Sequence, residues 1–193
     1  MVDIRIDSVK IWFIIQGEYR FNPILSKSTK WLNWIAIISL TTCEICKYNN
    51  GQIRKSIADW STRPPVHRRC RCSIEPMTSI NAGTATIQDI NGADYWLKNS
   101  NKLPTYYLTK RKAEKLGWNS RAGNLHKVAP GKQISGGIFK NTEDKLPSAS
   151  GRTWYEADIN YTKGFRNEHR VLFSNDGLIF VTYDHYETFF EII

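Results

Sequence analysis

Cysteine is absent from residues 73–193, so that part of the chain must fold without a disulfide or a thiolate-bound metal ion. Long apolar runs are also absent. The run at residues 31–40 is ten residues long and contains Asn33, whereas a membrane-spanning helix needs about 20 apolar residues. We therefore predict no membrane span.

A secretion signal is not evident either, because Asp3 and Asp7 lie near the start and no compact apolar stretch ends in a small-residue cleavage site. If the protein is exported, we expect another route. No internal repeat or low-complexity tract is present. The 193 residues are 41% hydrophobic and 12% aromatic, which is typical of a globular chain of one or two domains.

Acidic residues are scarce relative to basic ones, and the formal net charge is +9. Residues 1–84 have 12 Lys and Arg against 6 Asp and Glu, and residues 85–193 have 15 against 12. This excess suits a polyanion, since Lys and Arg neutralise phosphates and release counterions. It also suits an acidic protein or a membrane surface, so charge alone identifies no partner.

Composition divides the chain into four segments. We assign no fold to residues 1–42, and residues 43–77 form a Cys/His-rich module. The small, polar residues 78–84 have the composition of a linker. Residues 85–193 are then a second domain.

Within that domain, helical signals precede strand signals. Apolar residues recur at spacings of three and four over residues 87–99, and Thr109 and Gly117 bracket a second, short helix at 110–116. Short runs rich in β-branched and aromatic residues follow, separated by turn residues; they lie at 153–159, 169–174, 177–182 and 187–192. The fold class is α+β, with helices packed on an antiparallel sheet.

The predicted strands carry an acid–base set. Glu156 and Asp158 alternate on one strand, so they point to one face and can meet Arg170 of a facing strand. A structural ion-pair network that includes Arg166 is the simpler interpretation of that spacing. His185 lies between two strands and can donate a proton near neutral pH, although a lone loop histidine is usually just solvated.

Longer motifs in this half resemble the barnase family of bacterial guanyl-specific extracellular ribonucleases. They are residues 151–161 (GRTWYEADINY), 164–167 (GFRN) and 184–186 (DHY). The match also includes 101–104 (NKLP), 116–118 (LGW), 123–125 (GNL), 128–132 (VAPGK) and 136–137 (GG). It spans about 110 residues, essentially one whole barnase domain.

The resemblance implies cleavage of single-stranded RNA after guanosine, without a metal, through a 2′,3′-cyclic phosphate that is then hydrolysed. Glu156 matches the general base and His185 the general acid. Positive groups stabilise the charge that develops on a phosphoryl oxygen, and three cations match those of the family: Lys110, Arg166 and Arg170. Tyr186 matches the tyrosine beside the scissile phosphate, and Asp158 a buried aspartate that ties the two arginines together.

The loop at residues 139–146 matches the family's guanine-binding loop, with Glu143 and Asn141 as base-contacting residues. It also departs from the family pattern. Thr142 replaces an arginine, Asp144 replaces a glycine, and upstream Gly137 replaces an aspartate. The resemblance implies an acidic inhibitor of the barstar type as a partner. The missing cation at Thr142 predicts weaker binding to barstar itself, whose charge pairs with barnase are a known example of strong coupling.

The module at 43–77 has five soft or imidazole ligands, more than the four of a tetrahedral structural zinc site. They are Cys43, Cys46, His67, Cys70 and Cys72. Structural zinc, paired disulfides and free cysteines all fit this set. The pattern, with PPVHRRCRC at residues 64–72, resembles the C-terminal signature of phage head-morphogenesis (minor capsid) proteins, which also occurs as a pre-toxin module.

Three functional hypotheses follow from the sequence. The first is a monomeric guanyl-preferring endoribonuclease, secreted or delivered into target cells as a toxin, that needs no cofactor for catalysis. The second is an RNA- or protein-binding module with weak catalysis. The third is a phage head structural protein with a passenger nuclease domain.

Overall fold

A computed structural model describes residues 3–7, 10–15, 18–19 and 23–193. The chain forms two compact units, which are described separately below. The first contains residues 1–26, 79–139 and 153–193, and the second contains 27–78 and 140–152. The loop at 140–152 thus belongs to the same unit as the Cys/His-rich residues.

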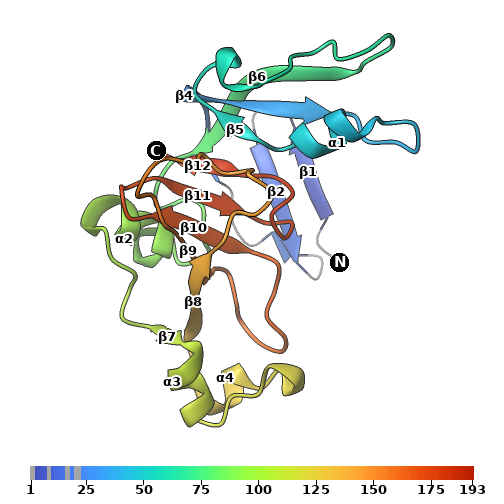
Figure 1. Ribbon diagram of the computed structural model, residues 1–193. Coiled ribbons are helices and arrows are strands. Elements are labelled where there is room, and N and C mark those ends of the chain that lie inside the picture. The colour runs from blue at the N-terminus through green and yellow to red at the C-terminus, as the bar shows by residue number, and fades with distance from the viewer. Residues whose placement is uncertain (1–2, 8–9, 16–17, 20–22) are drawn as a thin grey trace. The chain divides into compact units, whose positions relative to one another are not determined.

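A twisted sheet forms the centre of the first unit (Figure 1). Its strands are β7 (Tyr107–Thr109), β8 (Gln133–Phe139), β9 (Trp154–Asp158), β10 (Arg170–Ser174), β11 (Ile179–Thr182) and β12 (Phe190–Ile192). They lie in the order β12-β11-β10-β9-β8-β7. Neighbouring strands from β8 to β12 are antiparallel, whereas β7 and β8 are parallel. The predicted α+β class is confirmed.

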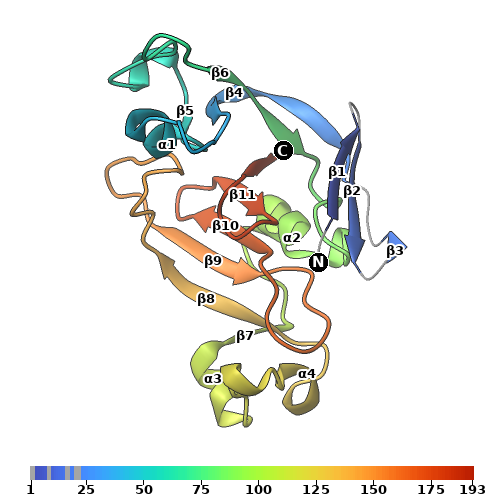
Figure 2. The ribbon, with the colours of Figure 1, turned by 90° about the vertical axis from the view of Figure 1, so that its right-hand side faces the viewer.

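Helix α2 (Ala93–Ser100) packs on strands β10 and β11 (Figure 2). It begins later than the predicted residue 87, because Gly92 is the N-cap and a 3₁₀ turn at Asp89–Asn91 precedes it. Leu97 faces the main core with Val171 and Val181, and all three are buried. At about 25 cal/mol per Å² of apolar surface, this burial is the main favourable contribution to folding.

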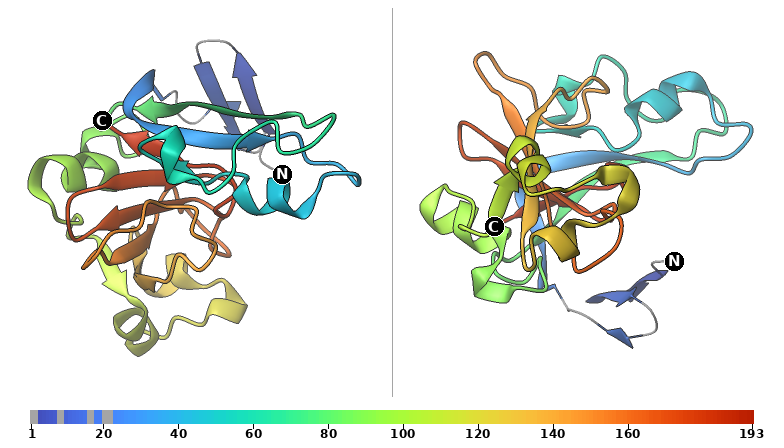
Figure 3. Two further views of the ribbon diagram at one scale, coloured as in Figure 1. Left: turned by 45° about the horizontal axis from the view of Figure 1, so that its top comes forward. Right: turned by 90° about the horizontal axis from the view of Figure 1, so that it is seen from below.

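The second predicted helix is confirmed as α3 (Lys110–Lys115). The Thr109 hydroxyl accepts a hydrogen bond from the Lys112 amide, and Gly117 has φ +93°, the left-handed conformation that ends a helix. Helix α4 (Leu125–Val128) packs near it around buried Trp118. Figure 3 shows α3 and α4 beside each other and apart from α2, and a 3₁₀ turn at Ser120–Ala122 connects them.

Near the N-terminus, β1 (Asp3–Asp7), β2 (Lys10–Ile15) and β3 (Glu18–Tyr19) form an antiparallel sheet. The second unit contains most of β4 (Leu25–Ala36) and β6 (Cys72–Ile80), with β5 (Ile53–Arg54), α1 (Glu44–Asn49) and a 3₁₀ turn at Ile57–Asp59. Its core includes Trp34 and Trp60, whose rings lie 6.1 Å apart.

The segment at 78–84, which has the composition of a linker, begins with three residues that complete β6. Ser79 and Ile80 pair with β12 in parallel, and both are buried. A single isoleucine among small, polar residues carries too little signal to predict a strand, because cross-strand pairing determines its burial. The predicted domain boundaries, including the linker, stay predictions.

Across the described ranges, the structure has no helix that is both long and apolar enough to cross a membrane.

Candidate active site and cysteine cluster

A buried carboxylate links two arginines at the end of β9 in the first unit. Asp158 is fully buried and lies opposite Arg170 of β10. Arg166 donates Nε and one Nη to the two oxygens of Asp158 at 2.6 and 2.5 Å, and Arg170 Nε lies 3.1 Å from Oδ1. The hydrogen bonds that Arg166 donates to Asp158 raise the pKa of Arg166, so its guanidinium stays charged. Such bidentate pairs are among the strongest charged contacts in proteins.

Glu156 lies two residues earlier on the same face of β9, where Tyr186 contacts it. The Tyr186 hydroxyl donates a hydrogen bond to Glu156 Oε2 at 2.5 Å. Burial and this hydrogen bond raise the pKa of Tyr186, so the phenol remains a donor at neutral pH. The Phe139 ring stacks on Tyr186 with centroids 5.1 Å apart and fixes its orientation. Glu156 is therefore a carboxylate held in one place.

His185 precedes Tyr186 in a turn of unusual backbone geometry. Both residues have positive φ, +55° and +74°, which bulky side chains rarely adopt. Asp184 stabilises the turn by accepting hydrogen bonds from the Thr182 hydroxyl and the Thr188 amide. Strain of this kind costs about 1–3 kcal/mol per residue and is common at functional sites. The turn places the exposed His185 ring 4.9 Å from that of Tyr186, centroid to centroid.

The other two histidines of this unit are engaged by the fold. Burial lowers the pKa of His169 to about 4, with a smaller effect from Arg170, so the ring is neutral near pH 7. His126 Nδ1 accepts a hydrogen bond from the Gly164 amide, which commits it to the local structure. Of the three, only His185 is exposed, and its ring lies 4.9 Å from that of Tyr186, which donates a hydrogen bond to Glu156.

Lys110 reaches this region through strand register. It directly follows Thr109, which pairs with Ser135 of β8, and Ser135 pairs with Ala157 of β9. The exposed lysine therefore begins α3 at the same level of the sheet as Glu156. Tyr186 thus contacts both Glu156 and His185, and Asp158 binds both arginines. Among the described residues, Lys110 has no such contact on which to place it, and only the strand register puts it at this level of the sheet.

Gly136 is a further residue of this region, and no pattern in the sequence predicted its role. Strands β8 and β9 have a bulge here, because two residues between Ser135 and Ile138, Gly136 and Gly137, oppose the single residue Glu156 on β9. A Cβ atom at Gly136 would clash with the Glu156 side chain and would lie 2.7 Å from its carbonyl oxygen. Bulges often lie next to active sites, where they redirect a side chain. Only the repeated glycine in the sequence signals this constraint.

In the second unit, the loop at 140–152 is braced by its own side chains. Asn141, predicted to contact the base, donates from its amide to the Leu146 carbonyl at 2.8 Å and accepts from the Leu146 amide at 3.0 Å. Its side chain therefore shapes the loop. Glu143 is exposed, and Lys145 Nζ lies 3.1 Å from its carboxylate.

The five predicted metal ligands gather in two overlapping groups that share Cys46. One is Cys43, Cys46 and His67, and the other is Cys46, Cys70 and Cys72; within each group the ligand atoms lie within 4.8 Å of one another. All four cysteines are free thiols, with Cys46 Sγ 3.8 Å from Cys70 Sγ. Burial raises the pKa of Cys70, but hydrogen bonds with the backbone of Val66 and Cys72 outweigh it and give about 6.

This α+β unit carries a fixed carboxylate, two arginines and an exposed histidine. Such groups are typical of enzymes that act on phosphate esters. The ribonuclease family model matches residues 92–193. A ribonuclease of Bacillus intermedius is 53% identical over 116 residues, which are 60% of this chain and 72% of that protein. The chain belongs to the ribonuclease family, and it is an enzyme that acts on RNA.

Two further ribonucleases agree with this assignment. That of Heyndrickxia coagulans is 53% identical over 108 residues, 56% of this chain and 99% of the relative. That of Bacillus pumilus is 46% identical over 132 residues, 68% and 81% of the two chains. The predicted membership of the barnase family is thereby confirmed, whereas the resemblance to phage head proteins stays a prediction.

The bulge yields a matched pair of variants. We expect Gly136→Ala to lower kcat/KM for RNA cleavage about 100-fold, since it would displace Glu156, the predicted general base, and a shift of about 1 Å in such a group has that effect. Gly137→Ala should stay within about twofold of the wild type, because a Cβ there meets no atom within 4 Å. Steady-state kinetics checks both, with thermal unfolding to establish that each is folded. Equal losses in the two variants would contradict the role of Gly136.

Proposed function

We propose that this protein is an endoribonuclease that cleaves single-stranded RNA after guanosine by acid–base catalysis without a metal ion. The observation that carries the proposal is the hydrogen bond from Tyr186 to Glu156, which holds a carboxylate close enough to Arg166 to act on its charge. The Tyr186 ring also lies 4.9 Å from that of the exposed His185. General acid–base catalysis needs a proton acceptor, a proton donor and a stabilised transition state. This group of residues supplies all three.

In the first step, Glu156 takes the proton of the guanosine 2′-hydroxyl, whose oxygen attacks the phosphorus. The bond from phosphorus to the 5′-oxygen breaks, and His185, in its protonated form, gives its proton to that leaving oxygen. The products are a 2′,3′-cyclic phosphate and a free 5′-hydroxyl. Arg166, Arg170 and Lys110 stabilise the charge on the phosphoryl oxygens, and Tyr186 lies beside the phosphate.

In the second step, the two residues exchange roles. His185, now neutral, takes a proton from water, and the resulting hydroxide oxygen attacks the cyclic phosphate. The bond to the 2′-oxygen breaks, and Glu156 returns the proton to it, leaving a 3′-phosphate. Asp158 takes no part in proton transfer. Its single buried charge holds Arg166 and Arg170, whose combined charge exceeds it, so the cluster remains positive toward a phosphate.

Base choice falls to Glu143 in the loop at 140–152. A carboxylate there accepts from the N1 and N2 hydrogens of guanine, while backbone amides reach O6, and adenine lacks that donor pair. The loop bends through Asn141 and Asp144, both with positive φ, so its amides can point to one side. Thr142 leaves the loop with one cation fewer than the barnase pattern, which favours weaker binding to barstar.

We propose that the enzyme acts outside the cell that produces it. An unrestrained ribonuclease endangers its own host, so we infer a monomeric toxin, secreted or delivered into target cells, with a dedicated acidic immunity protein of the barstar type. The net charge of +9 supports both RNA and an acidic inhibitor as partners, because it speeds association with either.

We also propose that the cysteine cluster holds one structural zinc ion. Sulfur atoms that bind a tetrahedral zinc ion at about 2.3 Å lie about 3.8 Å apart. The Cys46–Cys70 separation fits this value, and His67 turns Nε2 toward Cys46 because Nδ1 lies 2.9 Å from the Arg68 carbonyl oxygen. Four of the five ligands would hold the ion and join α1 to the start of β6.

The proposed chemistry is tested with the dinucleotides GpA and ApA in EDTA. We expect the wild type to cleave GpA in preference, and Glu156→Ala and His185→Ala each to lower kcat by about 10²- to 10⁴-fold. Glu168→Ala, which removes an exposed carboxylate, is the matched control and should retain activity. Folded wild-type protein that binds RNA without cleaving it would favour an RNA-binding module or a phage head component.

The zinc proposal predicts one equivalent of zinc per chain by mass spectrometry of the metal. Cys46→Ser should lose it, because Cys46 belongs to both ligand groups, whereas His126→Gln in the other unit should keep it. Chelation should release the zinc and leave GpA cleavage intact. If protein purified from buffers that contain zinc has disulfides and no bound metal, the proposal is wrong.

A further inference from the structure

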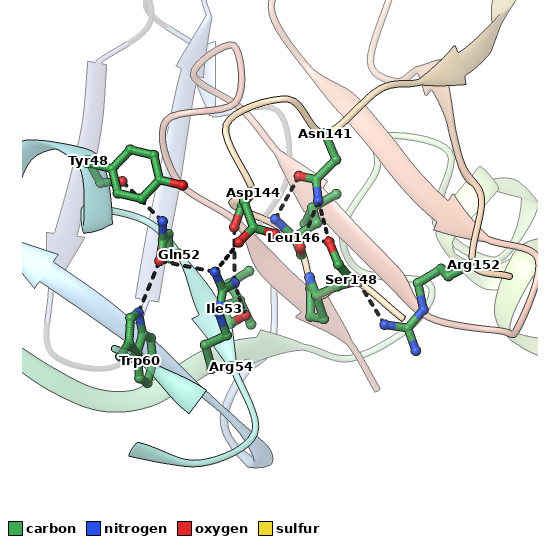
Figure 4. A network of polar contacts seen from close by, with 11 residues as sticks. Tyr48, Gln52, Ile53, Arg54, Trp60, Asn141, Asp144, Leu146, Ser148 and Arg152 are labelled. Carbon is green, nitrogen blue, oxygen red and sulfur yellow. Dashed lines mark hydrogen bonds and ion pairs between the residues drawn. The ribbon is translucent and has the colours of Figure 1, made fainter. Parts of the chain in front are cut away.

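The loop at 140–152 is bound by residues far away in the sequence (Figure 4). The Ile53 amide donates to the Lys145 carbonyl at 2.8 Å. Arg54 donates one Nη to the Asp144 carbonyl at 3.0 Å and the other to the Asp144 carboxylate at 2.5 Å. Strand β5 therefore binds the loop through backbone and side chain together, across about 90 positions of sequence.

Residues close to Arg54 in the sequence also hold its side chain in place. Gln52 is almost fully buried, and its Oε1 accepts from Arg54 at 3.1 Å and from the Trp60 indole at 3.2 Å. Gln52 Nε2 donates to the Tyr48 carbonyl at the end of α1. The Arg54 side chain is only 15% exposed and lies over the Trp60 ring. A guanidinium positioned in this way loses little conformational freedom on binding a carboxylate.

Asp144 meets two requirements of its position, a left-handed backbone conformation and a carboxylate that binds Arg54. Its φ of +51° is a conformation in which glycine, asparagine and aspartate are the residues usually found. Glycine would meet the backbone requirement but would give Arg54 no carboxylate. The second oxygen of Asp144 accepts from the Ser148 hydroxyl at 3.0 Å, so the same carboxylate joins β5 to the far side of the loop. The departure from the barnase pattern at this residue thus has a structural role.

We propose that Arg54 and Asp144 are positioning residues for base recognition by the loop at 140–152. This inference rests on the proposed function, in which the loop at 140–152 reads guanine through Glu143. Neither residue touches the reacting atoms. Arg54 acts through Asp144, whose backbone and side chain set the shape of the loop immediately after Glu143.

A loop that binds the base equally in the ground state and the transition state contributes to KM and not to kcat. In the full-length chain, we expect Arg54→Met to raise KM for GpA about tenfold with kcat unchanged, as for a lost charged hydrogen bond. The preference for GpA over ApA should fall to the same extent, and Arg54→Lys should restore part of it. Lys55→Met, which removes the neighbouring cation above Trp31, is the control and should leave both constants unchanged.

Asp144→Gly keeps the backbone conformation and removes the carboxylate, so its effect should equal that of Arg54→Met. The double variant should be no worse than either, because both changes remove the same contact. Additive effects, or a loss in Arg54→Met no larger than in Lys55→Met, would overturn the inference.

Hydrogen exchange gives a readout that does not depend on catalysis. Arg54→Met should speed amide exchange in the peptide spanning 140–152 at least tenfold, and Lys55→Met should not. Unchanged exchange would overturn the positioning role even in an active enzyme. A wild type that cleaves GpA and ApA equally would instead refute the proposed base preference, while faster loop exchange in Arg54→Met would still support the contact.

Discussion

The contact of Asp158 with Arg166 and Arg170 is the interaction on which the first unit depends. It lies where β9 and β10 pair, so it fixes both the end of the sheet and the position of two cations. Removing one partner of a buried ion pair generally costs about 3–5 kcal/mol, because the other charge remains in a region of low dielectric. The same network thus secures the fold and the positive potential of the site, and neither can vary alone.

Other features of the site reflect the same need for fixed geometry. Glu156 is restrained by the Tyr186 hydroxyl, and Gly136 leaves the space that Glu156 occupies. The two left-handed residues His185 and Tyr186 carry strain that the surrounding Asp184 hydrogen bonds offset. A site that is organised before substrate binds loses little energy to rearrangement during the reaction.

Sequence patterns predicted the parts of this arrangement that are local. Alternation along one strand placed Glu156 and Asp158 on one face, and Thr109 with Gly117 bounded a helix as capping chemistry requires. The start of α2 was predicted too early, because an apolar stripe does not reveal that the preceding turn is 3₁₀.

The contacts that escaped prediction are those between distant segments. The bulge at Gly136 depends on the register of two strands, and Arg54 meets Asp144 across about 90 residues. No periodic pattern in the sequence predicts the bulge or this contact. In the sequence, Asp144 stands out only as a departure from a family pattern. The structure shows that its carboxylate binds Arg54. The brace that Asn141 forms within its loop was hidden in the same way.

Product analysis with GpA and with the same dinucleotide carrying 2′-deoxyguanosine, both in EDTA, tests the proposed mechanism at its first step. Transesterification needs the 2′-hydroxyl as nucleophile, so we predict that GpA yields guanosine 2′,3′-cyclic phosphate before the 3′-phosphate and that the deoxy substrate stays intact. Cleavage of the deoxy substrate, or direct formation of the 3′-phosphate without the cyclic intermediate, would contradict the acid–base mechanism assigned to Glu156 and His185.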